Sequence, residues 1–115
     1  MSKRRDKEYL SDIIEAIERI ADYVKGLSYS GFMQDKKTQD AVIRNLEVIG
    51  EATKGITSAL RKRHAGVPWT DMARLRDRLA HHYFGINYEI VWNVVSKELP
   101  PLRSQLAALL TREFE

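Results

Sequence analysis

YLSDIIEAIERIADYVK, residues 9–25, places large apolar side chains at intervals of three and four residues. Because an α-helix completes one turn in about 3.6 residues, these side chains lie along one face, and the charged ones occupy the other. The apolar positions are Leu10, Ile13, Ile14, Ile17, Ile20, Ala21 and Val24. The stretch therefore predicts a long amphipathic helix that must bury its apolar face against other helices.

The middle of the chain continues in helical periods, and no segment alternates apolar and polar residues as a strand would. Residues 42–60 predict a second long helix that contains Gly50 and Gly55, where the absence of a side chain suggests close helix packing. Gly66-Val67-Pro68 breaks this pattern. A third helix is predicted to start at Met72 and to end near Gly85.

Two further helices are predicted towards the C-terminus. Asn87 suits a helix start, because its side-chain oxygen can accept the N–H groups that a first turn leaves unbonded. Pro100-Pro101 should kink or restart the chain before a leucine-rich terminal helix, since proline has no N–H to donate. The expected fold is all-α: an up-and-down helical bundle of four main helices plus a terminal helix, in one domain of residues 1–115.

Composition narrows the class of protein. The chain has 115 residues, 43% of them hydrophobic, which is enough for one core and too little for two. Its 19 Lys and Arg against 16 Asp and Glu give a net charge of +3, which weakly favours anionic partners. The absence of cysteine excludes disulfides and thiolate catalysis. No apolar run approaches the roughly 20 residues that span a bilayer, so we expect a cytoplasmic protein without membrane contact.

Reactive side chains are most concentrated in residues 76–85, RDRLAHHYFG. Arg76 supplies a fixed cation, His81 an imidazole that titrates near neutrality, and Tyr83 a phenol. These groups suit phosphodiester chemistry. No two of the chain's three histidines have the four-residue spacing of a helical metal site, so we expect neither a metal nor a cofactor.

Helix geometry separates the two main groups of this run. On a straight helix Arg76 borders the apolar stripe, whereas His81 shares a polar face with Asp77, four residues earlier. The two groups can converge if the helix loosens before Gly85, or if a second copy of the chain supplies the complementary group. We expect dimerisation to bring them together.

A purely structural interpretation of the run also stays open. Arg76 can form an ion pair with Glu47 or Glu51 on the preceding helix, because a guanidinium beside an apolar stripe needs a partner. His81 and His82 would then be ordinary helix-end residues that the helix dipole favours. Ion-pair networks of this kind are commoner than active sites.

The order Arg, four residues, His, any residue, Tyr resembles the signature of the HEPN superfamily. The flanking Val67-Pro68-Trp69, the run from Arg76 through Asn87, and Ile49-Gly50-Glu51-Ala52 are similar to the HepT-like branch of that superfamily. The resemblance covers nearly the whole chain. It implies a small all-α homodimer, or a larger even assembly, that acts as the toxin beside an MntA-like minimal nucleotidyltransferase as antitoxin.

The resemblance also implies roles for individual residues. Arg76 and His81 would be the catalytic pair of a metal-independent endoribonuclease, which cleaves RNA through the RNA's own 2′-hydroxyl. Tyr83 would receive AMP from the nucleotidyltransferase, and this modification would switch the ribonuclease off. Many relatives have Asn at the position of Asp77, whose carboxylate we expect to raise the pKa of His81 through the four-residue contact.

Three more residues in or beside the run have supporting roles in this interpretation. Arg74 and Arg78 flank the expected cleft and would guide RNA through its phosphates, and His82 belongs to the same motif. An alternative of a different class keeps the same cleft but no catalysis: a noncatalytic module that binds a nucleotide or the partner enzyme. Growth arrest and RNA breakdown on expression of the chain alone would separate the two functions.

Overall fold

The structure is a computed structural model that describes residues 2–80 and 85–114, with side chains from residue 5 onward. Within these residues the chain forms helices and no strand, which confirms the all-α prediction. The elements in chain order are α1 (Ser2–Val24), α2 (Tyr29–Met33), α3 (Lys36–Lys54), α4 (Ser58–Arg63), α5 (Trp69–Ala73), α6 (Leu75–Leu79), α7 (Tyr88–Asn93), the π-helical turn η1 (Val94–Glu98) and α8 (Leu99–Phe114).

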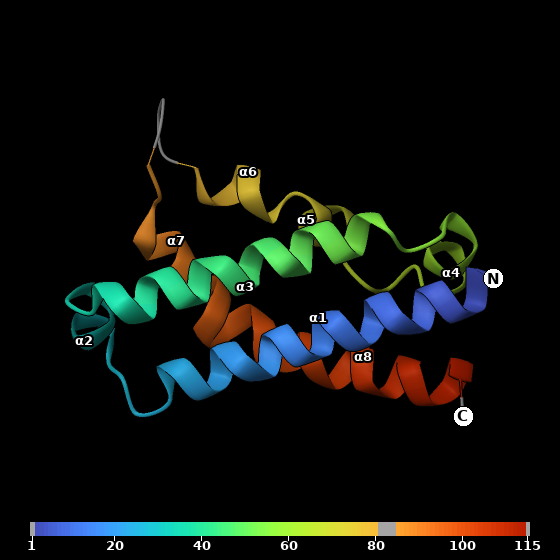
Figure 1. The fold of residues 1–115 in the computed structure, drawn as a ribbon, viewed down its shortest axis with the longest axis horizontal. Coiled ribbons are helices and arrows are strands. Elements are labelled where there is room, and N and C mark those ends of the chain that lie inside the picture. Colours follow the sequence, from blue (N-terminus) through green and yellow to red (C-terminus); the bar gives the residue numbers. More distant parts are fainter. Residues whose placement is uncertain (1, 81–84, 115) are drawn as a thin grey trace.

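Three long helices, α1, α3 and α8, form the body of the molecule. Helix α1 packs against both α3 and α8, and the short helices α5 and α6 run along the side of α3 that faces away from α1 (Figure 1). Each long helix contributes its apolar stripe to one core, whose fully buried members include Leu10, Ile13, Ile20, Val42, Leu46, Ile49 and Leu106. Removal of these side chains from water holds the helices together, at roughly 1.5–3 kcal/mol for each large aliphatic residue.

The second predicted helix begins and ends earlier than residues 42–60 suggested, because α3 starts at Lys36 and ends at Lys54, and α4 begins as a separate helix. Thr57 starts α4, with its hydroxyl oxygen accepting the Leu60 N–H at 3.3 Å. The buried Asp6 carboxylate fixes this start by accepting from the Thr57 N–H at 2.9 Å and from its hydroxyl at 2.7 Å. Close packing is confirmed at Gly55, where an added Cβ would lie 2.5 Å from the Tyr9 ring.

The third predicted helix, residues 72–85, is wrong in extent. It is divided at Arg74 into α5 and α6, and α6 ends at Leu79. Ala80 is extended, with φ −66° and ψ 142°, and forms an isolated antiparallel bridge with Ile86. The Asn87 N–H donates to the Leu79 carbonyl at 2.8 Å. Main-chain contacts from the far side of residues 81–84 therefore stop the helix where sequence periodicity alone would continue it.

The two C-terminal predictions are confirmed. The Asn87 side chain accepts the N–H groups of Glu89 and Ile90, so it caps α7 as expected. The helix then bends at η1 and continues without a break as α8, whose first turn contains Pro100 and Pro101 (Figure 1). A proline lacks the N–H that would bond back to the preceding turn, and a wider π-helical turn lies just before these two prolines. Over the described residues, no helix is long and apolar enough to cross a membrane.

An ion-pair cluster joins the end of α4 to the end of α8. The Glu113 carboxylate accepts from the Arg63 guanidinium at 2.8 Å and lies 2.7 Å from the His64 ring Nε2. Hydrogen bonds from Arg63, and then from His64, lower the pKa of Glu113 from 4.5 to about 2. Nearby Arg61 donates to the Thr53 carbonyl at 2.7 Å. Part of the basic run at residues 61–64 is therefore occupied in holding the fold together.

The lowered pKa of Glu113 predicts how its contribution to stability depends on pH. A carboxylate with a depressed folded-state pKa stabilises the protein above its unfolded pKa and loses that effect as pH falls through the folded value. The difference in free energy of unfolding between the wild type and Glu113→Gln should therefore be full above about pH 4.5 and vanish towards about pH 2. Urea unfolding across this interval measures it. A difference that does not change with pH would contradict the assignment.

Candidate active site

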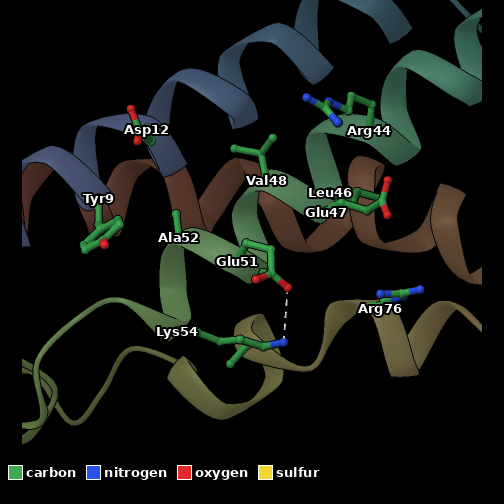
Figure 2. Close-up of a pocket in the computed structure, with 12 residues that line it drawn as sticks. Tyr9, Asp12, Arg44, Leu46, Glu47, Val48, Glu51, Ala52, Lys54 and Arg76 are labelled. Carbon is green, nitrogen blue, oxygen red and sulfur yellow. Dashed lines mark hydrogen bonds and ion pairs between the residues drawn. The ribbon is translucent and has the colours of Figure 1, made fainter.

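Arg76 lies on the exposed side of α6, next to the helix's buried face. Leu75 and Leu79 are four residues apart and are each 3% exposed, so they anchor the helix on α3 and leave Arg76 facing outward. The Arg76 side chain lines a groove of about 530 Å³ that crosses α3 from α1 to α6 (Figure 2). The apolar pattern of α6 thus determines where the guanidinium lies.

Charged side chains of α3 make up much of the groove wall. They are Arg44, Glu47, Glu51 and Lys54, while α1 contributes Tyr9 and Asp12. Glu51 pairs with Lys54 at 3.2 Å, and this contact is drawn in Figure 2. Within residues 5–80 and 85–114, Arg76 forms neither a hydrogen bond nor an ion pair. The ion pair of Arg76 with Glu47 or Glu51, which the sequence left open, is not formed in this part of the chain.

Arg78 has the opposite environment from Arg76. Its two terminal nitrogens donate to the two Glu98 carboxylate oxygens, each at 3.0 Å, and this hydrogen bonding raises the pKa of Arg78. The Asn93 side-chain amide donates to the same carboxylate at 3.4 Å. Sequence reasoning missed Glu98, because it lies twenty residues away on another element and no local spacing connects the two side chains.

Two other supporting residues of the motif, Arg74 and Asp77, are exposed. Arg74 lies at the junction of α5 and α6, where its side chain caps neither helix, and Asp77 lies within α6. The expected contact of Asp77 with His81 assumed a helix that continues past Ala80. Because α6 ends at Leu79, that assumption is wrong.

His81, His82 and Tyr83 lie outside the described residues, but both ends of their segment are described. The Ala80–Ile86 bridge and the hydrogen bond from Asn87 to the Leu79 carbonyl hold these two ends side by side. Arg76 lies about one helical turn before Ala80. The helix therefore does loosen before Gly85, which was one of the two routes by which Arg76 and His81 could converge.

Fold and site together define a class: a small all-α protein whose surface groove contains an arginine with no partner among the described residues, one turn before a segment of chain that carries two histidines and a tyrosine. The model of the family described as Ribonuclease HepT-like matches residues 13–109, and the chain belongs to this family. The motif resemblance seen in the sequence is thereby confirmed.

Named relatives match over most of their own length. A protein of Thermococcus cleftensis named "Probable ribonuclease HepT" is 45% identical over 107 residues, which cover 93% of this chain and 97% of the relative. Two proteins named "Putative RNase" are also similar. One, from Methanocaldococcus jannaschii, is 49% identical over 87% of this chain and 83% of its own. The other, from Caldanaerobacter subterraneus, is 40% identical over 93% of this chain and 96% of its own. No solved structure matches the chain.

The exposed position of Arg76 predicts that its removal does not destabilise the fold. Arg76→Ala should change the free energy of unfolding by no more than about 0.5 kcal/mol, as expected for a surface side chain that has no partner in the part of the chain that the structure describes. Urea unfolding of the variant and the wild type measures this change. A loss well above 1 kcal/mol would instead reveal an ion pair that holds α6 on α3.

Proposed function

We propose that this chain is a metal-independent endoribonuclease and the toxin of a toxin–antitoxin pair, in which Arg76 and His81 act on one phosphodiester. Membership of the Ribonuclease HepT-like family supports the reaction class, as do the ribonuclease names of its relatives. One structural observation carries the assignment to this site: Arg76 is a cation without a partner among residues 5–80 and 85–114, and it lines a groove one helical turn before the segment that contains His81.

The chemistry requires little more than these two groups, because RNA supplies its own nucleophile. His81 takes the proton of the 2′-hydroxyl, and the resulting oxygen forms a bond to the adjacent phosphorus. The bond from phosphorus to the 5′ oxygen breaks, and that oxygen takes up a proton from water. The products are a 2′,3′-cyclic phosphate and a 5′-hydroxyl end. Arg76 donates to two phosphate oxygens at once and neutralises the charge that builds up on them.

Charge in the groove suggests where RNA lies. On the α3 wall the carboxylates of Glu47 and Glu51 are offset by Arg44 and Lys54, whereas Arg76 on α6 is a cation without a carboxylate partner among the described residues and would attract phosphate. We therefore place the scissile phosphate at the α6 end of the groove, towards residues 81–84. We further propose a homodimer or larger even assembly that brings two copies of this end together, so that an RNA strand lies between them.

Regulation by a partner enzyme completes the proposal. An MntA-like nucleotidyltransferase would transfer AMP to the Tyr83 hydroxyl, two residues after His81. The attached nucleotide adds bulk and a negative phosphate where the RNA phosphate must bind, so repulsion and loss of space would both exclude the substrate. This would make the nucleotidyltransferase the antitoxin of the pair.

Catalysis by Arg76 and His81 predicts a specific loss of cleavage. Arg76→Ala and His81→Ala should each lower RNA cleavage by at least about 100-fold, because each removes a group that acts only on the reacting atoms. Both variants should stay folded and should relieve the growth arrest that the wild type causes. Cleavage should continue in EDTA, and end-group analysis should find 2′,3′-cyclic phosphates.

Two outcomes would count against this function. Products with 3′-hydroxyl ends that require an added divalent cation would indicate metal-dependent hydrolysis. An inert wild type that still binds the nucleotidyltransferase would favour the noncatalytic binding module. Arg112→Ala is a suitable control, because Arg112 is an exposed cation near the far end of α8, away from the groove.

Modification of Tyr83 predicts a change in mass that depends on the partner. Coexpression with the nucleotidyltransferase should increase the intact mass of the chain by one or more AMP units and abolish RNA cleavage. Tyr83→Phe should show no increase and should remain toxic in the presence of the partner, because the ring stays but the acceptor hydroxyl is gone. AMP found on another residue, with Tyr83→Phe still silenced, would refute the assignment.

A further inference from the structure

The ion pair between Arg78 and Glu98 joins the motif helix to the C-terminal part of the fold. Arg78 lies on α6, one residue before that helix ends, and Glu98 is the last residue of η1. Both hydrogen bonds are 3.0 Å long, and the two side chains are only 31% and 41% exposed. A bidentate pair of this kind fixes orientation as well as distance, since the planar guanidinium and the carboxylate must lie edge to edge in nearly the same plane.

The main chain that carries Glu98 is anchored in the core. The residue after it, Leu99, begins α8 and is 3% exposed, and Leu102 and Leu106 extend the same buried stripe into the core. The Asn93 amide also donates to Glu98 and restricts it from a second side. A carboxylate held in this way can fix the position of α6, because α8 cannot move without disturbing the core.

The surroundings of Arg78 disfavour a phosphate. Glu98 already accepts from both terminal nitrogens, and Glu89 lines the shallow surface hollow beside Arg78. The negative charge of Asp71 also acts on the Arg78 guanidinium. An RNA phosphate would have to displace one carboxylate and approach two others, whereas at Arg76 it meets a guanidinium that no described residue binds.

We propose that Arg78 is a positioning residue: through Glu98 it fixes the end of α6 on η1, and so sets the point from which residues 81–84 begin, without touching RNA. The inference rests on the proposed function for its consequence in catalysis. The positioning of α6 can also be tested without any measurement of catalysis. The hydrogen bond from the Asn87 N–H to the Leu79 carbonyl reports directly whether the two ends of the segment stay together.

The test compares Glu98→Gln, Arg78→Glu, and the exchanged pair Arg78→Glu with Glu98→Arg. For each, kcat and KM on RNA are measured across a range of salt, together with hydrogen exchange at the Asn87 amide. Glu18→Gln is the matched control, since Glu18 accepts two hydrogen bonds from Arg103 in an exposed pair between α1 and α8. Glu98→Gln is nearly isosteric, so it stays informative if Arg78→Glu fails to fold.

A positioning role predicts that Glu98→Gln lowers kcat by about 10- to 100-fold with little change in KM, as expected when reacting groups are displaced by about 1 Å. Exchange at the Asn87 amide should become faster. The exchanged pair should restore most of the kcat and most of the protection of the Asn87 amide from hydrogen exchange. Glu18→Gln should keep the wild-type kcat.

An RNA contact at Arg78 predicts the opposite pattern and would overturn the inference. Arg78→Glu would then raise KM and reduce the salt dependence of binding by about one unit, and the exchanged pair would stay defective. Glu98→Gln would keep its kcat. If the wild type cleaves no RNA, the proposed function fails, and the rate of hydrogen exchange at the Asn87 amide alone decides. An unchanged rate in Glu98→Gln overturns the positioning role. A faster rate in Glu98→Gln that returns to the wild-type value in the variant with Arg78→Glu and Glu98→Arg supports it.

Discussion

The hydrogen bond from the Asn87 N–H to the Leu79 carbonyl is the constraint on which the site depends. At 2.8 Å, and with the Ala80–Ile86 bridge beside it, this bond joins the end of α6 to the start of α7. It takes up a carbonyl at the end of the helix, and the extended Ala80 turns the chain away from the helix axis. The helical periodicity of α6 consequently ends before the segment that carries His81 and Tyr83, and the two described ends of that segment lie side by side.

Basic residues divide into two groups according to their partners. Arg61, Arg63, Arg78 and Arg103 each donate to a carboxylate or a carbonyl of another element, so they hold the fold together. Arg76 has no such partner among the described residues and faces a groove whose α3 wall is partly acidic. The small net charge of +3 therefore does not show which guanidinium groups are paired and which, such as those of Arg44 and Arg76 in the groove, have no such partner among the described residues. RNA recognition by a nearly neutral protein needs this kind of local arrangement, because the overall charge attracts it only weakly.

Sequence patterns predicted what depends on neighbouring residues and missed what depends on distant ones. The apolar stripe of α1 and the Asn87 cap are local features, and both were predicted correctly. The end of α6 was not, because it depends on a main-chain bond to Asn87, eight residues further on. The division of residues 42–60 into α3 and α4 depends on Asp6, which lies 51 residues from Thr57. For the site, the motif identified Arg76, but only the structure showed that Arg78 is already paired with Glu98 and that Arg76 is not.

The central claim is that Arg76 and His81 act on the same phosphodiester of the RNA. Its most direct test is a crystal structure of the assembly with an RNA whose cleavage-site nucleotide lacks the 2′-hydroxyl, so that the substrate binds and cannot react. We predict a phosphate within hydrogen-bond distance of the Arg76 guanidinium, with a His81 imidazole facing the carbon that normally carries the hydroxyl. A phosphate bound away from Arg76, or an imidazole that no RNA strand can reach, would contradict the account.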